Sequence, residues 1–365
     1  MTESLTMPQP RPQDVRTLAV IVGLDLVGDA LMKLPFLRAA RTAFPGAEIS
    51  WITAQGATAY SGVLRATAHP YLDHIYEQPE WLPHRNNPEP LFAAPHFDVI
   101  LDTRGRWRET LRARQLPHDL FLSPAARYLF SDRRPRQFWR RPVHIQDRLA
   151  ELVRLAAGFT PVVTGGIAVP DEARQKAVAI MPPGARYVGL VPGAGNAVKI
   201  WPLENFIALA AAQAKAGRVP VFLLGPQEQS WLPELQKALP SARFPLQNQV
   251  WNGQMTLAAT MAVGERLVCA VTNDNGTSHM LAAVDCPLVS LFGPTEATKL
   301  APRVSLTRIV RAQDFGGRAM EVIPVHAVVA AVDEIMLAEP VADKAEPWPL
   351  LLTEAMEDTD RAASA

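Results

Sequence analysis

Short apolar runs alternate with longer amphipathic segments along most of the chain. Each run holds four to seven apolar residues and is bounded by Gly, Pro, Asp or Asn. Continuous apolar runs of this length are typical of parallel strands that are buried on both faces. The sequence therefore predicts strands at 17–24, 47–53, 97–103, 187–193, 219–225, 266–274 and 286–293.

The segments between these runs often have helical spacing. After Pro202, which can occupy the first helical position, apolar residues recur at intervals of three and four: Leu203, Phe206, Ile207, Ala210, Ala211 and Ala214. A second helix is predicted over 143–159. Alternation of strand and helix predicts an α/β fold with doubly wound parallel sheets.

The alternation is interrupted from about 104 to 186, where the sequence becomes rich in Arg and Pro, and it restarts at Tyr187. We therefore expect two Rossmann-like doubly wound domains that face a central cleft, which is the natural ligand site. The predicted boundaries are 17–160 for the N-terminal domain with its Arg-rich insertion, 161–186 for a linker and 187–338 for the C-terminal domain. Residues 1–16 and the acidic, proline-interrupted 339–365 are predicted to be flexible tails.

Composition narrows the function classes. The 365 residues suffice for two domains, and 36 Lys and Arg balance 36 Asp and Glu, which argues against a general nucleic-acid binder. The two cysteines, Cys269 and Cys286, supply neither a disulfide framework nor a four-cysteine metal site, and we expect them in the core. Without a secretory leader or a spanning apolar stretch, the chain is expected to be cytoplasmic.

Gly28-Asp29 marks the first candidate site, where a strand gives way to a helical segment containing Pro35. An Asp at this place can cap the helix, which is the structural interpretation. It can also act as a general base at the carboxyl end of the first strand. Pro35 is expected to kink or shorten the helix.

The second candidate site is the stretch 188–202, in which a strand runs into a loop with two glycines, then Lys199, Trp201 and a Pro-initiated helix. Backbone amides and one cation in this arrangement are typical of an anion site. The loop is not a Walker loop, because the Gly-Lys-Ser/Thr ending is absent. The structural alternative is a solvated Lys199 beside a packing Trp201.

The third stretch, 272–296, is the most informative. Six polar or small residues crowd the end of one strand and the start of an apolar helix, and the next strand ends in Gly293-Pro294-Thr295. Capping by Asn275 or Thr277 accounts for one or two of the six. A helix that begins here would point its N–H groups at a diphosphate. The six are Asp274, Asn275, Gly276, Thr277, Ser278 and His279.

Together the three segments resemble glycosyltransferase family 9, the bacterial heptosyltransferases of lipopolysaccharide core assembly. The matching motifs are a Gly-Asp before an apolar helix with an internal proline, a Pro-Gly-Ala loop with Lys-x-Trp-Pro, and an Asp-Asn-Gly-x-x-His followed by Gly-Pro-Thr. They occur in the family's order and spacing over most of residues 17–300.

The resemblance implies a GT-B fold and inverting transfer of heptose from ADP-heptose, without a metal or other cofactor, to a lipopolysaccharide core or related envelope glycan. It makes Asp29 the general base, and it lets Lys199 offset charge on the departing diphosphate. The N-terminal domain would bind the acceptor and the C-terminal domain the donor. The implied donor-binding residues are Gly193, Ala194, Gly195, Lys199, Asp274, Asn275, Gly276, Thr277, Ser278 and His279.

Several alternatives stay open. The chain has Gly23-Leu24-Asp25-Leu26-Val27 before Gly28-Asp29, whereas family members commonly carry a basic residue there, so a contact to the usual acceptor or donor is missing. Asp25, which also occurs in some members of the family, is a second candidate for the base. Another nucleotide-sugar or acceptor is compatible with the same fold. A non-catalytic sugar-nucleotide or glycan-binding protein is the alternative of another class, and a dehydrogenase lacks the expected G-x-G-x-x-G with a following acid.

The Arg-rich segment from Arg104 to Arg148 holds twelve Arg, no Lys and four acids. Arg without Lys favours bidentate recognition of phosphate or carboxylate. We expect it to meet an acidic glycolipid acceptor and the anionic surface of the inner membrane, with Trp107, Phe138 and Trp139 as interfacial anchors. The alternative is a solvated basic loop. The residues expected at this surface are Arg104, Arg106, Arg108, Arg133, Arg134, Arg140 and Arg141.

Overall fold

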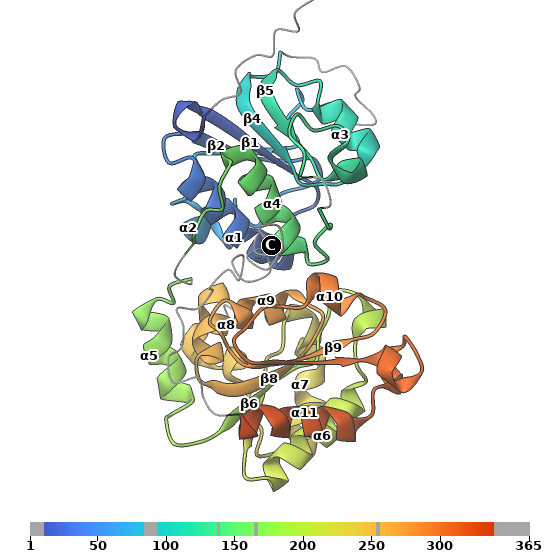
Figure 1. Ribbon diagram of the computed structural model, residues 1–365. Helices are drawn as coiled ribbons and strands as arrows, with labels where there is room; N and C mark the ends of the chain where they lie inside the picture. Colours follow the sequence, from blue (N-terminus) through green and yellow to red (C-terminus); the bar gives the residue numbers. More distant parts are fainter. Residues whose placement is uncertain (1–10, 84–92, 137–138, 164–166, 253–255, 339–365) are drawn as a thin grey trace, which may run out of the picture. The chain divides into compact units, whose positions relative to one another are not determined.

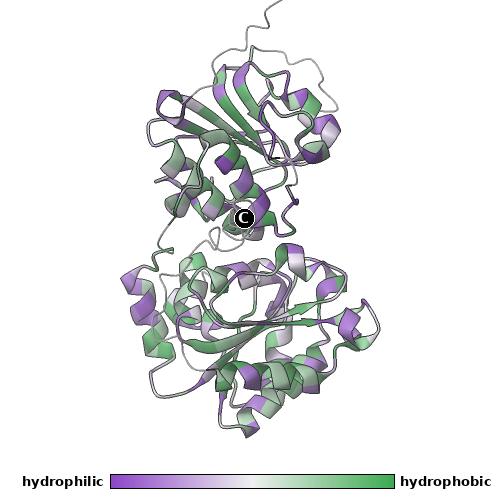
Figure 2. Cartoon of the chain, viewed as in Figure 1, coloured by the Kyte–Doolittle hydropathy of each residue, from purple (hydrophilic) through white to green (hydrophobic). Residues whose placement is uncertain are grey.

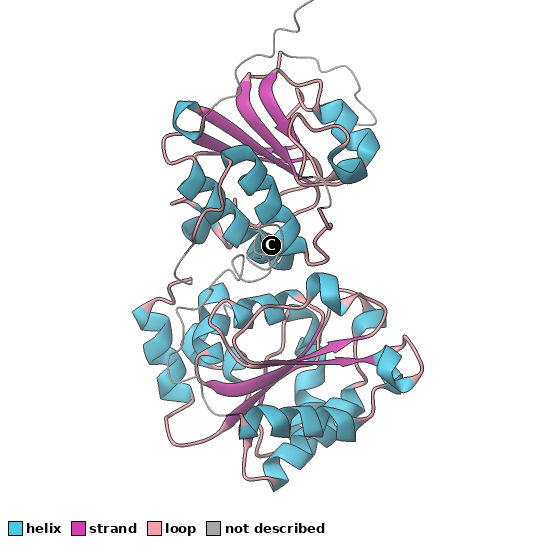
Figure 3. Cartoon of the chain, viewed as in Figure 1, coloured by secondary structure: helices cyan, strands magenta, loops and turns pink. Residues whose placement is uncertain are grey.

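The computed structural model describes residues 11–83, 93–136, 139–163, 167–252 and 256–338. The chain divides into two compact units, of which the first extends to Val163 and the second begins at Thr164 (Figure 1). Each unit contains a parallel five-stranded sheet. Helices flank the sheet in each unit (Figure 3). The predicted α/β fold class with two doubly wound sheets is confirmed.

The first unit has the strand order β3-β2-β1-β4-β5. Helices α1 and α4 pack against each other beside this sheet. The strands are β1 (Thr17–Val22), β2 (Glu48–Thr53), β3 (His74–Glu77), β4 (Phe97–Asp102) and β5 (His118–Leu122), and the helices are α1 (Val27–Ala43), α2 (Arg65–Ala68), α3 (Trp107–Ala113) and α4 (Ile145–Ala157).

The second unit has the strand order β10-β9-β8-β6-β7. Its strands are β6 (Tyr187–Val191), β7 (Val219–Phe222), β8 (Leu267–Asn273), β9 (Leu288–Phe292) and β10 (Thr307–Arg311). Its helices are α5 (Asp171–Ile180), α6 (Leu203–Lys215), α7 (Leu232–Ala238), α8 (Leu257–Gly264), α9 (Gly276–Ala282), α10 (Ala297–Leu300) and α11 (Val325–Leu337).

Short 3-10 helices lie in the connections of both units. They are η1 (Pro12–Asp14), η2 (Ala125–Tyr128), η3 (Ala197–Lys199), η4 (Pro226–Trp231), η5 (Pro245–Gln247), η6 (Gln249–Trp251), η7 (Ala312–Phe315) and η8 (Met320–Val322). Residues 1–10 and 339–365, most of the two predicted tails, lie outside the described residues.

The strands of the second sheet are apolar because both of their faces are covered. Alternate residues of one strand enter two separate cores: Val221 and Leu223 of the β7 region pack with residues of α5, α8 and α9, whereas Phe222 and Leu224 pack with residues of α6, α7 and α11. Successive side chains of a strand point to opposite faces, so a run without polar residues is what two covering layers require. Figure 2 shows these strands mainly in the hydrophobic colour.

All seven predicted strands are present, but the interruption predicted from 104 to 186 is wrong in part. Helix α3, strand β5 and helix α5 lie inside it, whereas α4 confirms the helix predicted over 143–159. Helix α5 occupies much of the segment predicted as a linker and packs against α8. Pro35 does not shorten its helix, because α1 continues through it to Ala43.

Both strand orders change direction at one place. The chain winds outward from β1 toward β3 on one side and from β4 toward β5 on the other, so the first switch point lies between β1 and β4. The second lies between β6 and β8. In open α/β sheets, ligands bind outside the carboxyl ends of the strands at such points. The loops after β1, β4, β6 and β8 are therefore the places where a ligand site is expected.

Candidate functional site

The loops that follow β6 and β8 are joined by hydrogen bonds at the second switch point. The Asn273 side chain donates to Pro192 O at 2.7 Å and accepts from Trp201 N at 3.2 Å. The Asn275 side chain donates to Gly193 O at 2.6 Å. Two motifs about eighty residues apart in the sequence therefore form one structure, held by buried or half-buried amide side chains.

Lys199 and Asp274 form an ion pair across these two loops. Lys199 Nζ lies 2.7 Å from Asp274 Oδ2, and their side chains are 28% and 9% exposed. The interpretation of Lys199 as a solvated surface lysine is thus wrong, because its ammonium has a fixed and largely buried partner. An ammonium has three N–H donors, so one used by Asp274 leaves two for an anionic ligand.

Trp201 packs in the core, as the structural interpretation of this motif predicted. Its side chain is fully buried, and its indole N–H donates to Ile323 O at 2.9 Å. The Trp therefore anchors the loop that carries Lys199 and does not itself present a binding surface.

Glu228, on η4 after β7, is a site residue that the sequence motifs did not reveal. Its carboxylate accepts the Gly225 N–H at 2.9 Å, and a Cβ on Gly193 would lie 2.3 Å from Glu228 Oε1. Only glycine at position 193 lets the loop approach this carboxylate so closely. The available signal was an acid three residues beyond the glycine that ends the strand at 219–225.

Two of the polar residues at the start of α9, Asn275 and Ser278, hydrogen-bond each other. Asn275 is the N-cap, since its side chain accepts the Ser278 N–H at 2.9 Å, which confirms the predicted capping. The Ser278 hydroxyl donates to Asn275 O at 2.6 Å and the residue is buried, so Ser278 shapes the turn and its hydroxyl is not available to donate to a phosphate. His279 is also buried.

A third loop, Gly293-Pro294-Thr295, follows β9 and is held by hydrogen bonds from side chains later in the chain. Gln313 donates to Gly293 O at 2.6 Å, and Arg318 donates to Pro294 O at 3.2 Å. A Cβ on Gly293 would lie 2.6 Å from the sulfur of Met320. Glycine is therefore required where the chain leaves β9.

In the first unit, Asp29 lies in the first turn of α1, two residues after Val27, and is half-buried. Leu26 occupies the N-cap position of α1, and Asp29 is the third residue of the helix. A carboxylate in the first turn is stabilised by the helix dipole. The position, at the carboxyl end of β1, is the one expected at the first switch point.

Asp25, the other candidate base, is fully buried and already has three donors. It accepts from Lys33 Nζ at 2.6 Å, Thr58 Oγ1 at 2.6 Å and Trp51 Nε1 at 3.0 Å. A buried carboxylate with three internal donors ties the loop after β1 to its surroundings. It is poorly placed to take a proton from a substrate.

The Arg residues expected at an acceptor or membrane surface do not all lie on one. The Arg104 side chain is 5% exposed and pairs with Asp102 at 2.7 Å, which corrects its placement at the surface. Arg133 donates to Leu155 O and Ala156 O at the end of α4, and burial lowers its pKa. It is a structural contact of that helix. Arg106, Arg108, Arg134, Arg140 and Arg141 are exposed.

Of the predicted aromatic anchors, only Trp107 is largely exposed in the described part of the chain, at 51%. Trp139 packs edge-on against buried Tyr128, with ring centroids 5.5 Å apart. Phe138 lies outside the described residues. Within the described ranges, no helix is both long and apolar enough to span a membrane.

Two buried cysteines and one group of His and Asp side chains are the remaining candidates for chemistry in the described residues. Cys269 and Cys286 are buried as predicted, and burial raises the pKa of Cys269 to about 12. In the described residues, His96, Asp98 and Asp119 bring ligand atoms within 4.8 Å of one another. They lie at the amino ends of β4 and β5, away from the switch point, and Asp98 already accepts the Thr17 N–H at 3.0 Å.

Comparisons with known proteins identify the family of the chain. The family model for glycosyltransferase family 9 (heptosyltransferase) matches residues 94–319, more than half of the chain. Lipopolysaccharide heptosyltransferase 1 of Pseudomonas aeruginosa is 26% identical over 297 residues, covering 76% of this chain and 78% of that protein. The same-named enzyme of Escherichia coli K12 is 24% identical, covering 76% and 88%.

Solved structures share the fold. The glycosyl transferase family 9 protein of Veillonella parvula aligns with a TM-score of 0.65 at 17% identity, covering 88% of this chain and 97% of that one. The E. coli heptosyltransferase WaaC with ADP aligns with a TM-score of 0.60 at 20% identity, covering 87% and 99%. With its two parallel-sheet units in the GT-B fold and its family match, the chain is a glycosyltransferase and belongs to family 9, the heptosyltransferases.

Proposed function

We propose that this protein transfers heptose from ADP-heptose to an acidic sugar of the lipopolysaccharide core or a related envelope glycan, releasing ADP. Relatives named lipopolysaccharide heptosyltransferase 1 support the substrate class. The observation that carries the proposal is the Lys199–Asp274 pair, which bridges two loops at the switch point of the second unit. A cation held there by a carboxylate suits a diphosphate donor.

The donor is bound by the second unit. The two free N–H donors of the Lys199 ammonium hydrogen-bond the diphosphate, together with backbone amides of Gly193, Ala194 and Gly195 and of Gly276 and Thr277. Asp274 accepts hydrogen bonds from hydroxyls of the donor sugar. Glu228 follows the second strand of a β-α-β unit, the place where an acid meets ribose hydroxyls in dinucleotide-binding folds, and we assign it that contact.

Asp29 acts as the general base. It removes the proton from the acceptor hydroxyl as that oxygen attacks the anomeric carbon, the bond to the diphosphate breaks, and the configuration at that carbon inverts. Lys199 and the loop amides offset the charge that develops on ADP, and we propose that no metal ion takes part. Asp25 is assigned a positioning role, because its three donors are all internal.

The acceptor reaches the enzyme at a membrane. Trp107 and Leu111 lie one turn apart on α3, and Leu129 follows η2, which contacts α3; all three are exposed among exposed arginines. Apolar side chains ringed by Arg suit an anionic bilayer surface. We propose that this face docks on the cytoplasmic side of the inner membrane. Stronger cosedimentation with phosphatidylglycerol than with phosphatidylcholine vesicles, lost in Trp107→Ala, is the expected result.

Calorimetric titration with ADP, GDP and UDP tests the donor. ADP-selective binding is expected, because the donor is ADP-heptose. Preferential binding of GDP or UDP would keep the enzyme class and replace the donor. If none of the three nucleotides binds, the assignment of the second unit to the donor is wrong.

A further inference from the structure

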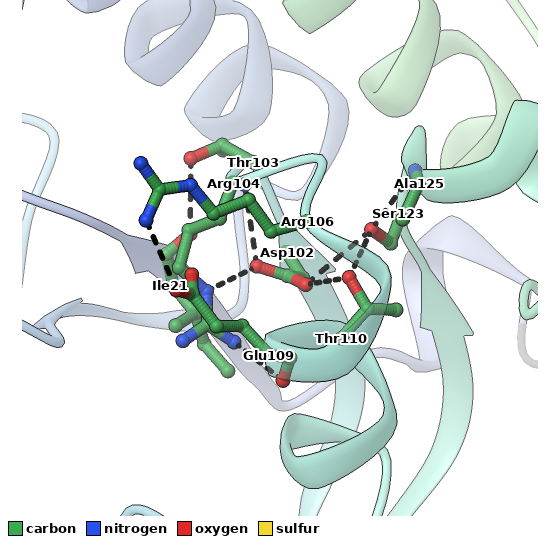
Figure 4. Close-up of polar contacts among 9 residues, drawn as sticks. All are labelled: Ile21, Asp102, Thr103, Arg104, Arg106, Glu109, Thr110, Ser123 and Ala125. Atoms are coloured by element: carbon green, nitrogen blue, oxygen red, sulfur yellow. Dashed lines mark hydrogen bonds and ion pairs between the residues drawn. The ribbon is translucent and has the colours of Figure 1, made fainter. Parts of the chain in front are cut away.

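A buried ion pair lies at the carboxyl end of β4, beside the first switch point. Asp102, the last residue of β4, is fully buried and accepts from Arg104 Nε at 2.7 Å (Figure 4). Desolvating two charges is unfavourable, so a buried pair is weak evidence for stability in itself. The pair matters here because it fixes neighbouring segments of the structure.

The Asp102 carboxylate joins three segments. Besides Arg104 it accepts from Thr110 Oγ1 on α3 at 2.7 Å and from Ser123 Oγ, just after β5, at 3.3 Å. Arg104 extends the network, because its Nη2 donates to Glu109 O at 3.1 Å. The loop after β4, the first turns of α3 and the end of β5 are therefore held by one buried group.

Thr103, within this segment, also hydrogen-bonds β1, the strand that precedes Asp29. Thr103, between the two charged residues, donates to Ile21 O from its backbone N–H at 2.9 Å and from its hydroxyl at 3.0 Å. Ile21 belongs to β1, whose carboxyl end continues into α1 and Asp29. The loop after β4 is thus fixed against the strand that positions the proposed base.

Exposed recognition groups lie at the tips of the two fixed loops. After Gly105, whose φ of 69° is left-handed, comes Arg106, whose side chain is 74% exposed and pairs with Glu109 through one guanidinium nitrogen at 3.3 Å. Exposed Trp107 follows. After Ser123 comes a turn in which Ala126, Arg127 and Tyr128 have φ of 47°, 55° and 65°. Left-handed backbone costs about 1–2 kcal/mol per non-glycine residue, so the surroundings must hold this turn.

The contacts that hold the strained turn start from the same network. The Ala125 N–H donates to Ser123 Oγ at 3.3 Å, and that hydroxyl also contacts Asp102. Tyr128 is buried against Trp139. The turn presents Arg127 to solvent. The backbone that carries Arg106 and Arg127 is therefore held in part by the Asp102 and Arg104 network.

We propose that Asp102 and Arg104 are positioning residues for acceptor recognition, holding Arg106 and Arg127 where they bind an anionic sugar of the acceptor. The guanidinium groups pair with its carboxylate or phosphate. This inference rests on the proposed transfer to an acidic glycan. Arg104 is itself buried and does not touch the acceptor; it acts by holding the neighbouring residues that do.

Arg104→Lys is the test. It keeps the positive charge but removes the guanidinium, whose Nε and Nη2 contact Asp102 and Glu109 O together. The expected result is an acceptor KM about tenfold higher, with the ADP-heptose KM and the ADP affinity within twofold of wild type. Arg106→Ala is expected to raise the acceptor KM similarly. The double variant is expected to raise the acceptor KM by less than the product of the two single effects, because part of the Arg104 effect acts through Arg106.

Arg41→Lys is the matched control, since Arg41 pairs with Asp73 away from the switch point of the same unit. An equal rise in acceptor KM in this control, or additive effects in the double variant, would overturn the positioning role. Hydrogen exchange of residues 103–110 gives a readout that needs no substrate, and it is expected to accelerate in Arg104→Lys only. Unchanged exchange rejects this inference, whereas wild-type protein that transfers no heptose rejects the proposed function and its acceptor.

Discussion

Replacing Lys199 by Met removes the one cation that the structure places between the β6 and β8 loops in the described part of the site. Two unit charges 4 Å apart interact by about 1 kcal/mol in water and about 4 kcal/mol at an effective dielectric constant of 20. A side chain that is 28% exposed lies between these limits. We take about 2 kcal/mol, which is roughly a 30-fold loss of ADP affinity.

The partner carboxylate makes this loss larger. Asp274 is 9% exposed, and without Lys199 it stands unpaired beside the diphosphate. Like charges at this range repel, so the expected loss is roughly 30- to 100-fold. Adding Asp274→Asn removes the repulsion. The double variant Lys199→Met/Asp274→Asn is therefore expected to bind ADP more tightly than Lys199→Met alone, and Asp274→Asn by itself to stay within about threefold of wild type.

Calorimetry with ADP at low and high ionic strength measures these affinities. Wild-type affinity is expected to fall more steeply with salt than that of Lys199→Met, because the charged contact is partly screened. Lys215→Met, an exposed lysine at the end of α6, is the control and is expected to match wild type. An ADP affinity of Lys199→Met within about threefold of wild type would contradict this role of Lys199, as would a lower ADP affinity in the double variant than in Lys199→Met.

Three further predictions follow from the surrounding structure. Gly193→Ala is expected to weaken ADP binding about tenfold by displacing Glu228, whereas Gly195→Ala, whose Cβ meets nothing within 4 Å, is expected to bind normally; equal affinities would contradict the close approach. The Ile49 N–H and Arg41 lower the pKa of Asp73 from its usual 3.8 despite the opposing effect of burial, so its stabilisation is present above that pH and lost as the pH falls below it. The free energy of unfolding in urea should thus differ between Asp73→Asn and wild type at pH 7, and the difference should shrink as the pH falls below 3.8. A difference that stays constant would reject this. Both buried thiols are expected to react with Ellman's reagent only on unfolding, and rapid labelling of native protein would show that Cys269 or Cys286 is accessible.

The sequence predicted the centre of each sheet better than its edges. The three strands that were missed, β3, β5 and β10, are all edge strands. An edge strand is covered less completely, so its residues need not be uniformly apolar, and none of the four residues of β3 is buried. Strand β5 was hidden because the arginines around it suggested an irregular segment, whereas its own residues 120–122 are buried.

The candidate site was predictable as far as its motifs are local. Gly193, Lys199 and Asp274 stand in short sequence motifs, but the ion pair between Lys199 and Asp274 joins residues 75 positions apart and depends on the pairing of β6 with β8. Glu228 and Asp102 belong to no pattern, since each is a single acid whose partners are brought close by the fold. Arg104 was misplaced for the same reason: its partner is the buried end of a strand, which composition does not reveal.

The central claim is that Asp29 is the base of a heptosyl transfer. The direct measurement is the initial rate of transfer from ADP-heptose to a lipopolysaccharide core acceptor by wild type, Asp29→Asn and Asp119→Asn, an exposed aspartate at the amino end of β5. Loss of a general base typically lowers the rate by about 10²–10⁴. We predict a fall of at least about 100-fold in Asp29→Asn alone, with unchanged ADP affinity. A rate within tenfold of wild type in Asp29→Asn would contradict the account.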